Sequence, residues 1–158
     1  MTKTRYSATD ANGTVHTRST ERTYTHTVVV QRSKDYAITR ANAHVAYSIK
    51  RAEEEFFYAA ATIEAILASF RARRLHNLGA DYAAERKAKG EEFVAKWGTP
   101  EAYAAAELAN DLAKIEATDW SVWHNLGWCG RPDLAQKAAA KAQRPANAAV
   151  VILEAVAA

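Results

Sequence analysis

Cysteine is almost absent from this sequence, since Cys129 is the single cysteine among 158 residues. One thiol cannot form a disulfide within the chain, and it excludes a zinc site built from several cysteines. No apolar run approaches the ~18 residues that would cross a bilayer. The first ten residues, MTKTRYSATD, lack the apolar core of a secretory signal. We therefore expect a cytoplasmic protein.

Glycine is also scarce, and the six glycines never take the spacing of a nucleotide-binding loop, G-x-G-x-x-G or G-x-x-x-x-G-K. The G-x-S-x-G elbow of α/β-hydrolases is missing as well. No two histidines form an H-E-x-x-H or H-x-x-x-H pair. The histidines are His16, His26, His44, His76 and His124. We therefore expect no cofactor, no metal site and no enzymatic activity.

Two polar groupings deserve a chemical interpretation. Cys129 and His124 are a conceivable nucleophile and base, or two of the ligands of a metal. They lie five residues apart on an irregular segment, which favours a thiol packed among aromatic side chains. Residues 53–55 are three consecutive glutamates, which point about 100° apart on a helix and so form no carboxylate pair.

The formal net charge is +3, and it is unevenly distributed. Residues 1–40 hold seven Lys and Arg against three Asp and Glu, which gives them a net charge of +4 and leaves −1 for the rest. The basic excess therefore belongs to the N-terminal quarter of the chain. This distribution disfavours a DNA-mimic inhibitor, which needs a strongly acidic surface.

A long apolar stripe is the clearest structural pattern. Steps of three and four residues connect eight apolar side chains, as on one face of a helix. They are Val45, Ile49, Ala52, Phe56, Ala59, Ile63, Ile66 and Phe70. The stripe predicts one helix over about residues 43–75, ended by Gly79. Its 26 residues span about 39 Å at ~1.5 Å per residue, so we expect it to be the central element. Residues 33–43, which precede it, suit a short strand, a helical turn or a loop, and of these we predict a loop.

Residues 4–32 are typical of β-structure. Asn12-Gly13 supplies the positive-φ residues of a tight hairpin turn. Residues 23–31 are dense in β-branched side chains, and the Val28–Val30 run indicates burial on both faces. The pattern predicts a three-stranded antiparallel meander. Residues 148–156 form a short apolar run that predicts a covered strand paired with that meander.

The remaining segments predict shorter helices. They cover residues 81–97, 100–117 and about 132–144, and Thr99-Pro100-Glu101 marks one clear start. Residues 118–130 hold three tryptophans on a strand or an ordered connection. We therefore predict a single α+β domain over residues 1–158. Its small antiparallel sheet combines the N-terminal meander with the C-terminal strand, and it packs against the long central helix and several shorter ones.

Arginines and one tryptophan supply the candidate binding positions. Basic N-terminal side chains interleaved with aromatics favour either a phosphate-binding surface or a solvated sheet face. The arginines near residue 74 suit either the negative end of a helix dipole or a binding patch. Trp128 beside Arg131 suits a partner contact, while large aromatics also fill cores. The candidates are Arg5, Arg18, Arg22, Arg32, Lys34, Arg71, Arg73, Arg74, Trp128 and Arg131.

Two runs resemble small accessory proteins carried by phages and integrated mobile elements. They are DANGTVHTRSTERTYTHTVVV at residues 10–30 and GWCGRPDLAQKA at residues 127–138, together about a fifth of the chain. Neither run is a catalytic motif. The resemblance implies a phage-type context in the host cytoplasm, a context that includes anti-CRISPR and other anti-defence inhibitors.

These observations predict a non-enzymatic binding protein that blocks a host protein or nucleoprotein complex. One alternative is a nucleic-acid-binding protein that uses the basic N-terminal sheet. The other is a homo-oligomeric structural protein that pairs through the long helix. No membrane partner is expected.

Overall fold

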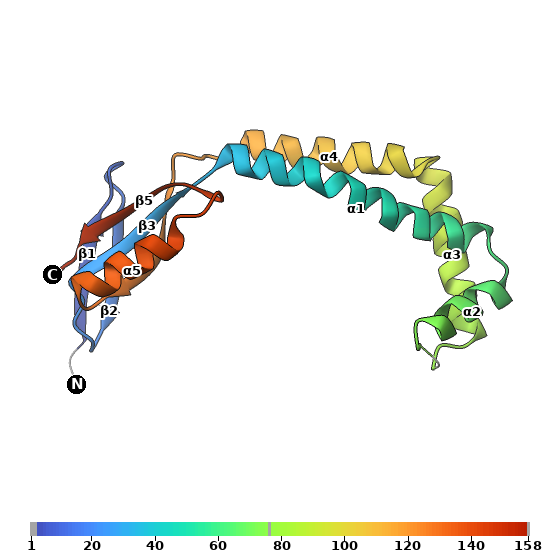
Figure 1. Ribbon diagram of the computed structural model, residues 1–158, viewed down its shortest axis with the longest axis horizontal. Helices are drawn as coiled ribbons and strands as arrows, with labels where there is room; N and C mark the ends of the chain where they lie inside the picture. Colours follow the sequence, from blue (N-terminus) through green and yellow to red (C-terminus); the bar gives the residue numbers. More distant parts are fainter. Residues whose placement is uncertain (1–2, 76, 158) are drawn as a thin grey trace. The chain divides into compact units, whose positions relative to one another are not determined.

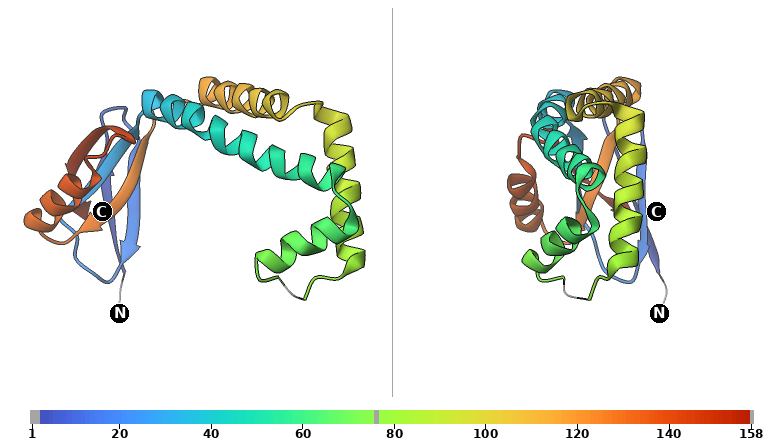
Figure 2. Two further views of the ribbon diagram at one scale, coloured as in Figure 1. Left: turned by 45° about the vertical axis from the view of Figure 1, so that its right-hand side comes forward. Right: turned by 90° about the vertical axis from the view of Figure 1, so that its right-hand side faces the viewer.

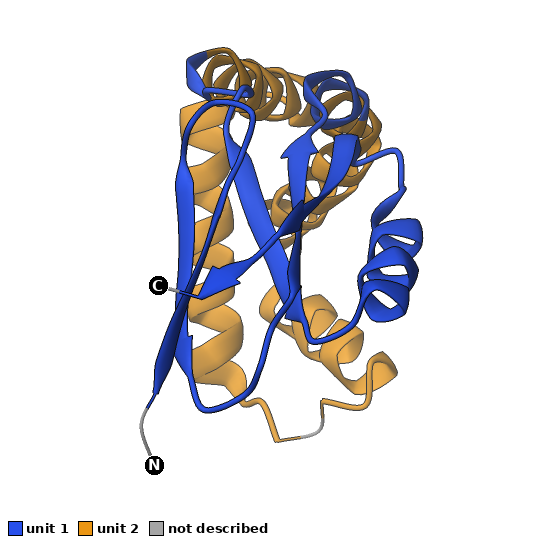
Figure 3. Cartoon of the chain, turned by 90° about the vertical axis from the view of Figure 1, so that its left-hand side faces the viewer, with its two compact units in different colours: residues 1–39, 117–158 blue, residues 40–116 orange. Residues whose placement is uncertain are grey.

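The computed structural model describes residues 3–75 and 77–157, which form an α+β fold of helices and antiparallel strands (Figure 1). The chain divides into two compact units (Figure 3). Residues 1–39 and 117–158 make the first, which we call the β unit, and residues 40–116 make the second, the helical unit. The α+β class is confirmed. Two compact units are compatible with one domain or with two, so the single domain remains a prediction.

The β unit contains two three-stranded antiparallel sheets. The first has the order β2-β1-β6, from Val15–Thr20, Thr4–Thr9 and Val156–Ala157. The second has the order β4-β3-β5, from Trp123–Cys129, His26–Arg32 and Asn147–Glu154. β1 and β2 form the predicted hairpin, and Gly13 takes a φ of +81° in its turn.

The predicted N-terminal meander was wrong in one respect, because β3 does not continue the hairpin. It lies at the centre of the second sheet, between β4 and β5. Val28, Val29 and Val30 are fully buried, and only a strand with neighbours on both edges and cover on both faces buries three consecutive side chains. The predicted pairing of the C-terminal segment is confirmed, since β5 pairs with β3 and β6 pairs with β1.

The β4-β3-β5 sheet is covered on both faces. Helix α5, Pro132–Ala142, packs against all three strands and buries Ala135 and Ala142 (Figures 1 and 2). By alternation along β3, Val28 and Val30 face α5. Thr27 and Val29 point the other way, towards β1, where Tyr6 and Ala8 are buried.

The helical unit contains most of α1, Lys34–Ala60, together with α2, Ile63–Ala72, α3, Ala80–Trp97, and α4, Pro100–Ala117. α4 runs back along α1, and the Ser48 hydroxyl on α1 donates to Glu107 on α4 over 3.0 Å (Figures 1 and 2). Tyr58, Ile66, Phe70 and Ala83 form the buried core where α1, α2 and α3 meet.

The predicted continuous helix over residues 43–75 was also wrong, because α1 ends at Ala60 and α2 begins at Ile63. Thr62 starts the new helix, since its Oγ1 accepts a hydrogen bond from the Ala65 N–H over 3.2 Å. The apolar stripe is nevertheless buried or half-buried along its whole length. Apolar spacing reports which side chains face the core, and it does not report whether the backbone between them is continuous.

Residues 33–43 were expected to form a loop, but α1 begins at Lys34 and includes residues 34–43. Ser33 caps this start, because its Oγ accepts from the Tyr36 N–H over 3.1 Å. Asp35 adds the negative charge that a first helical turn favours. The Ser-x-Asp signal was present in the sequence, and the β-branched Ile38 and Thr39 obscured it.

The other helices match their predictions closely. α3 and α4 differ by a residue or less from the predicted ranges, and α5 begins at the predicted proline. The tryptophan segment becomes strand β4, with Trp123 and Trp128 half-buried. Among the described residues, no helix is both long and apolar enough to cross a membrane.

Candidate binding site

A groove lies in the β unit, where the end of β1 faces the β4-β3-β5 sheet. It encloses about 300 Å³. Both sheets contribute to its walls, and most of the lining side chains are apolar. They are Thr9, Asp10, Ala11, Val29, Trp123, Val151 and Leu153, and we call this site the Trp123 groove. A volume of this size suits one or two apolar side chains or a small ligand.

Strand geometry explains why these residues meet. Val29 stands opposite Val151 in the β3–β5 pair, and Leu153 is opposite Thr27 on the same face. Gln31 pairs with Trp123 across β3 and β4, which brings the indole to the same face. Val151 remains 38% exposed, so the apolar floor is open to solvent.

The Asp10 turn makes the opposite wall, and its hydrogen bonds hold it firmly. Oδ1 of Asp10 accepts from the backbone N–H groups of Asn12 at 2.9 Å and Thr14 at 3.0 Å. Its Oδ2 lies 2.9 Å from Nε2 of His16. The Asn12 side chain donates to the Ser121 carbonyl over 2.8 Å, which ties the turn to the segment before β4.

The negative charge of the Asp10 carboxylate is stabilised by hydrogen bonds from within the hairpin. Burial raises the pKa of this carboxyl, but the hydrogen bonds from His16, Thr14 and Asn12 outweigh burial and hold the pKa below its ordinary value. Its side chain is only 1% exposed. Since both oxygens have partners, the groove presents an apolar surface with a rigid rim.

An aromatic cluster lies between the two sheets. Tyr24 contacts Tyr6 edge-on at 5.8 Å between ring centres and Trp128 at 6.2 Å. The Arg18 guanidinium lies 5.2 Å from the Tyr24 ring centre, within cation–π range. The fold thus brings two predicted positions, Arg18 and Trp128, together through Tyr24. Trp128 is half-buried, and its role as a partner contact stays a prediction.

The other predicted positions of the β unit are dispersed. Arg5 lies opposite Ser19 on the exposed outer face of the hairpin. Arg22 lies between β2 and β3, while Arg32 and Lys34 lie where β3 leads into α1. Arg131 precedes α5 and forms an ion pair with Asp133, with Nε 3.2 Å from Oδ1. These side chains do not converge on one point.

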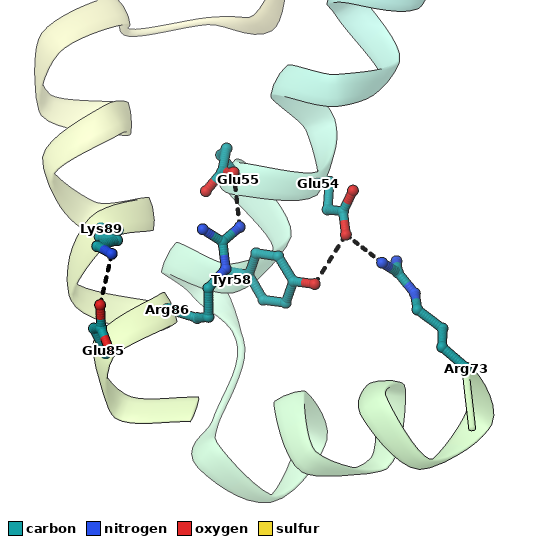
Figure 4. Close-up of polar contacts among 7 residues, drawn as sticks. All are labelled: Glu54, Glu55, Tyr58, Arg73, Glu85, Arg86 and Lys89. Carbon is teal, nitrogen blue, oxygen red and sulfur yellow. Dashed lines mark hydrogen bonds and ion pairs between the residues drawn. The ribbon is translucent and has the colours of Figure 1, made fainter. Parts of the chain in front are cut away.

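The arginines at the end of α2 lie in the helical unit. Arg73 forms an ion pair with Glu54 of α1, and Glu54 also accepts from the Tyr58 hydroxyl over 2.9 Å (Figure 4). The hydrogen bond from Arg73 is the main cause that lowers the pKa of Glu54, and burial raises the pKa of Tyr58. Arg73 therefore ties α2 back to α1. For Arg71 and Arg74, a binding role stays a prediction.

A second ion pair completes this network. Arg86 of α3 donates to Glu55 over 2.7 Å, and its guanidinium lies 4.5 Å from the Tyr58 ring centre (Figure 4). Consecutive glutamates on α1 thus bond to different helices, as their divergent directions require. The network stabilises the junction of three helices, and its charges are paired with one another.

Cys129 and His124 occupy the same strand, five residues apart. Strand geometry separates such positions by about 16 Å, too far for a nucleophile and its base. Within residues 3–75 and 77–157, no three His, Cys, Asp or Glu side chains gather as a metal site would require.

Comparisons with protein families, curated proteins and solved structures gave no match. Sequence reasoning missed the Trp123 groove, although the Asp10-x-Asn12-Gly13 turn signal was visible. Its floor depends on β3, β4 and β5 becoming neighbours, and no local pattern shows that.

Proposed function

We propose that this chain is a non-enzymatic binding protein whose β unit inserts into, or receives, part of a host protein or nucleoprotein complex. The Trp123 groove carries this proposal. It offers an exposed apolar floor beside a tryptophan on a wall held by hydrogen bonds. Rigid, partly desolvated pockets of this kind concentrate binding energy at protein interfaces.

Charge narrows the kind of partner. The β unit carries ten Lys and Arg against six Asp and Glu, whereas the helical unit carries eleven against twelve. The net charge of the β unit is therefore +4. A partner with an apolar side chain for the groove and an acidic surface around it fits this unit best.

The phage-type resemblance supports a narrower version of the proposal. In that version the protein blocks a bacterial defence complex, as an anti-CRISPR or other anti-defence inhibitor does. The small basic β unit would act by covering a surface that the complex needs.

The test compares two exposed valines of the β unit. Val151 lies in the groove, and Val156 on β6 lies outside it at 64% exposure. We expect tagged protein to capture one complex from a bacterial host lysate, Val151→Glu to lose it, and Val156→Glu to keep it. Equal capture by both variants, or no specific capture by the unaltered protein, would contradict the proposal.

Nucleic-acid binding is the second candidate, and the contact of Arg18 with Tyr24, which also contacts Trp128, favours it. Aromatic side chains beside a cation are typical of single-strand binding surfaces. Anisotropy of a labelled single-stranded oligonucleotide should then show binding that weakens steeply between 50 and 200 mM salt. Arg18→Ala should weaken oligonucleotide binding relative to the unaltered protein at the same salt concentration. A salt-insensitive signal, or none, would remove this candidate.

A further inference from the structure

Strand β5 is an open edge of the second sheet. Within residues 3–75 and 77–157, β3 is the only strand that pairs with it (Figure 1). The Ala155 N–H donates to the Thr25 carbonyl over 2.9 Å, which fixes the direction of the backbone groups along this part of the chain. By alternation, the backbone groups of Val151 point towards β3, whereas those of Val150 and Ile152 point away from the sheet.

The other edges carry features that block further pairing. β6 is only two residues long, and β2 is polar and carries Arg18. β4 has a register shift that leaves Leu126 without a partner in β3. Short strands, charges and bulges all protect sheet edges. In contrast, residues 148–153 of β5 are all apolar and include no proline, and residues 149–154 pair with β3 without a register shift.

The Trp123 groove opens on one face of this edge strand. Val151 and Leu153 belong to its lining. The side chains of a strand added to β5 would alternate between the two faces, so every second one would lie beside these two residues. When a peptide extends a sheet in this way, backbone hydrogen bonds supply affinity and pockets for alternate side chains supply specificity.

Charge distinguishes the two ends of the edge. Arg32 ends β3 opposite Asn147, and the Asn147 N–H donates to the Arg144 carbonyl over 2.9 Å. Both arginines are exposed, and neither forms an ion pair with another described residue. Glu154 lies at the other end of β5. An antiparallel strand with a basic residue near its amino end and an acidic residue near its carboxyl end complements this arrangement.

We propose that β5 binds an extended segment of the partner protein, which adds to the sheet as an antiparallel strand. Alternate apolar side chains of this segment enter the Trp123 groove, and a carboxylate at its carboxyl end lies beside Arg32 and Arg144. The inference rests on the proposed function and specifies the part of the partner that is recognised.

The probe for this test is a dye-labelled peptide, KVTVTVE. In the antiparallel register its valines lie opposite residues 149, 151 and 153, and its threonines lie opposite Val150 and Ile152. The threonine N–H groups therefore face β5, and the valine N–H groups face away. We expect fluorescence anisotropy to show that the peptide binds the intact chain.

Backbone methylation of the peptide separates strand addition from simple apolar contact. N-methylation of both threonines should weaken binding about tenfold or more, because two hydrogen bonds to β5 are lost. N-methylation of the first two valines is the matched control and should leave binding unchanged. Equal weakening by the two modifications, or no binding of the unmodified peptide, would overturn the proposal.

Hydrogen exchange locates the added strand. In the free protein, the N–H groups of Val150 and Ile152 should exchange at least tenfold faster than those of Val151 and Leu153, and the peptide should slow the first pair. If a second copy of the chain occupies this edge, the first pair will be protected in the free protein and more so at higher concentration. That result, or protection by the peptide elsewhere only, would overturn the proposal.

One pair of variants connects the edge to the natural partner. Val150→Pro removes a donor that points outwards, and Val150→Ala keeps it, so the comparison isolates the backbone group. We expect Val150→Pro to reduce capture of the complex from lysate at least fivefold relative to Val150→Ala. Equal capture by these two variants, with Val151→Glu still losing the complex, would overturn strand addition and leave the proposed function intact. The methylated peptides decide the question if Val150→Pro is unfolded.

Discussion

Individual residues carry much of the local specificity in this chain, and Asp10 is the clearest case. Its carboxylate joins the β1–β2 turn to His16 and makes one wall of the groove. Its two oxygens accept three hydrogen bonds, from Asn12, Thr14 and His16. The side chain is therefore a structural part of the candidate site, because both of its oxygens already accept hydrogen bonds within the turn.

Asp10 should make stability depend on pH. Its pKa in the folded chain lies below the ordinary value of 3.8, so its contribution is present above that value. The contribution is lost as the pH falls through the lower pKa of the folded chain. We expect Asp10→Asn to lower the melting temperature at pH 7 and to reduce the loss of stability between pH 5 and pH 2. Glu21→Gln, in an exposed loop, is the control and should change neither; an unchanged acid profile in Asp10→Asn would contradict this role.

Gly90 marks a close approach between helices. A Cβ at this position would lie 2.7 Å from both the Ala59 nitrogen and the Glu55 carbonyl oxygen, which are backbone atoms that cannot turn aside. Alanine would gain about 1 kcal/mol of helix propensity, but overpacking costs ~1–3 kcal/mol. We therefore expect Gly90→Ala to destabilise the protein in urea titrations. Gly127→Ala meets no atom within 4 Å and should be close to neutral.

At the scale of elements, the apolar stripe packs against other helices of the same chain. Phe56 on α1 meets Phe93 on α3 with 6.3 Å between ring centres. Ile66 and Phe70 on α2 are buried against Tyr58. The stripe thus joins several helices of one unit, and this internal packing disfavours its use as a contact between copies.

Adjacent phenylalanines test that packing. A fully buried phenylalanine loses ~3–5 kcal/mol on truncation to alanine. Phe56 is half-buried, so we expect Phe56→Ala to cost about 2 kcal/mol. Phe57 is 43% exposed, and Phe57→Ala should cost less. Equal melting temperatures for the two variants would mean that the stripe does not face the core.

The break between α1 and α2 can be tested by the sign of the stability change that Thr62→Ala causes. Where Thr62 is an N-cap, Thr62→Ala should destabilise by ~1 kcal/mol. In a continuous helix the same change would stabilise, because alanine has the higher helix propensity. Thr39→Ala, inside α1, is the control and should be neutral or slightly stabilising. Chemical denaturation of the three proteins distinguishes the two arrangements.

For the molecule as a whole, the two units differ in chemistry. The β unit holds the basic excess, the groove and the aromatic cluster, whereas the helical unit holds paired charges around Tyr58. Because the stripe is used internally, we expect a monomer in solution. Sedimentation velocity at several concentrations should give one constant coefficient, and a coefficient that rises with concentration would revive the alternative of pairing through helices.

The sequence by itself determined the elements with local signals. Pro100 and Pro132 start helices, Gly98 ends one with a φ of +71°, and Asn12-Gly13 turns the hairpin. Such signals act within a few residues, so they are readable without the fold. The apolar spacing likewise identified the buried face of α1 and α2 correctly.

Only the tertiary structure decided which elements are neighbours. β3 leaves the hairpin for a place between two strands that come from more than ninety residues later in the chain. That choice separates one predicted sheet into two and creates the Trp123 groove. Strand pairing joins distant residues through backbone hydrogen bonds that every residue can make, and so the sequence carries little information about the partner.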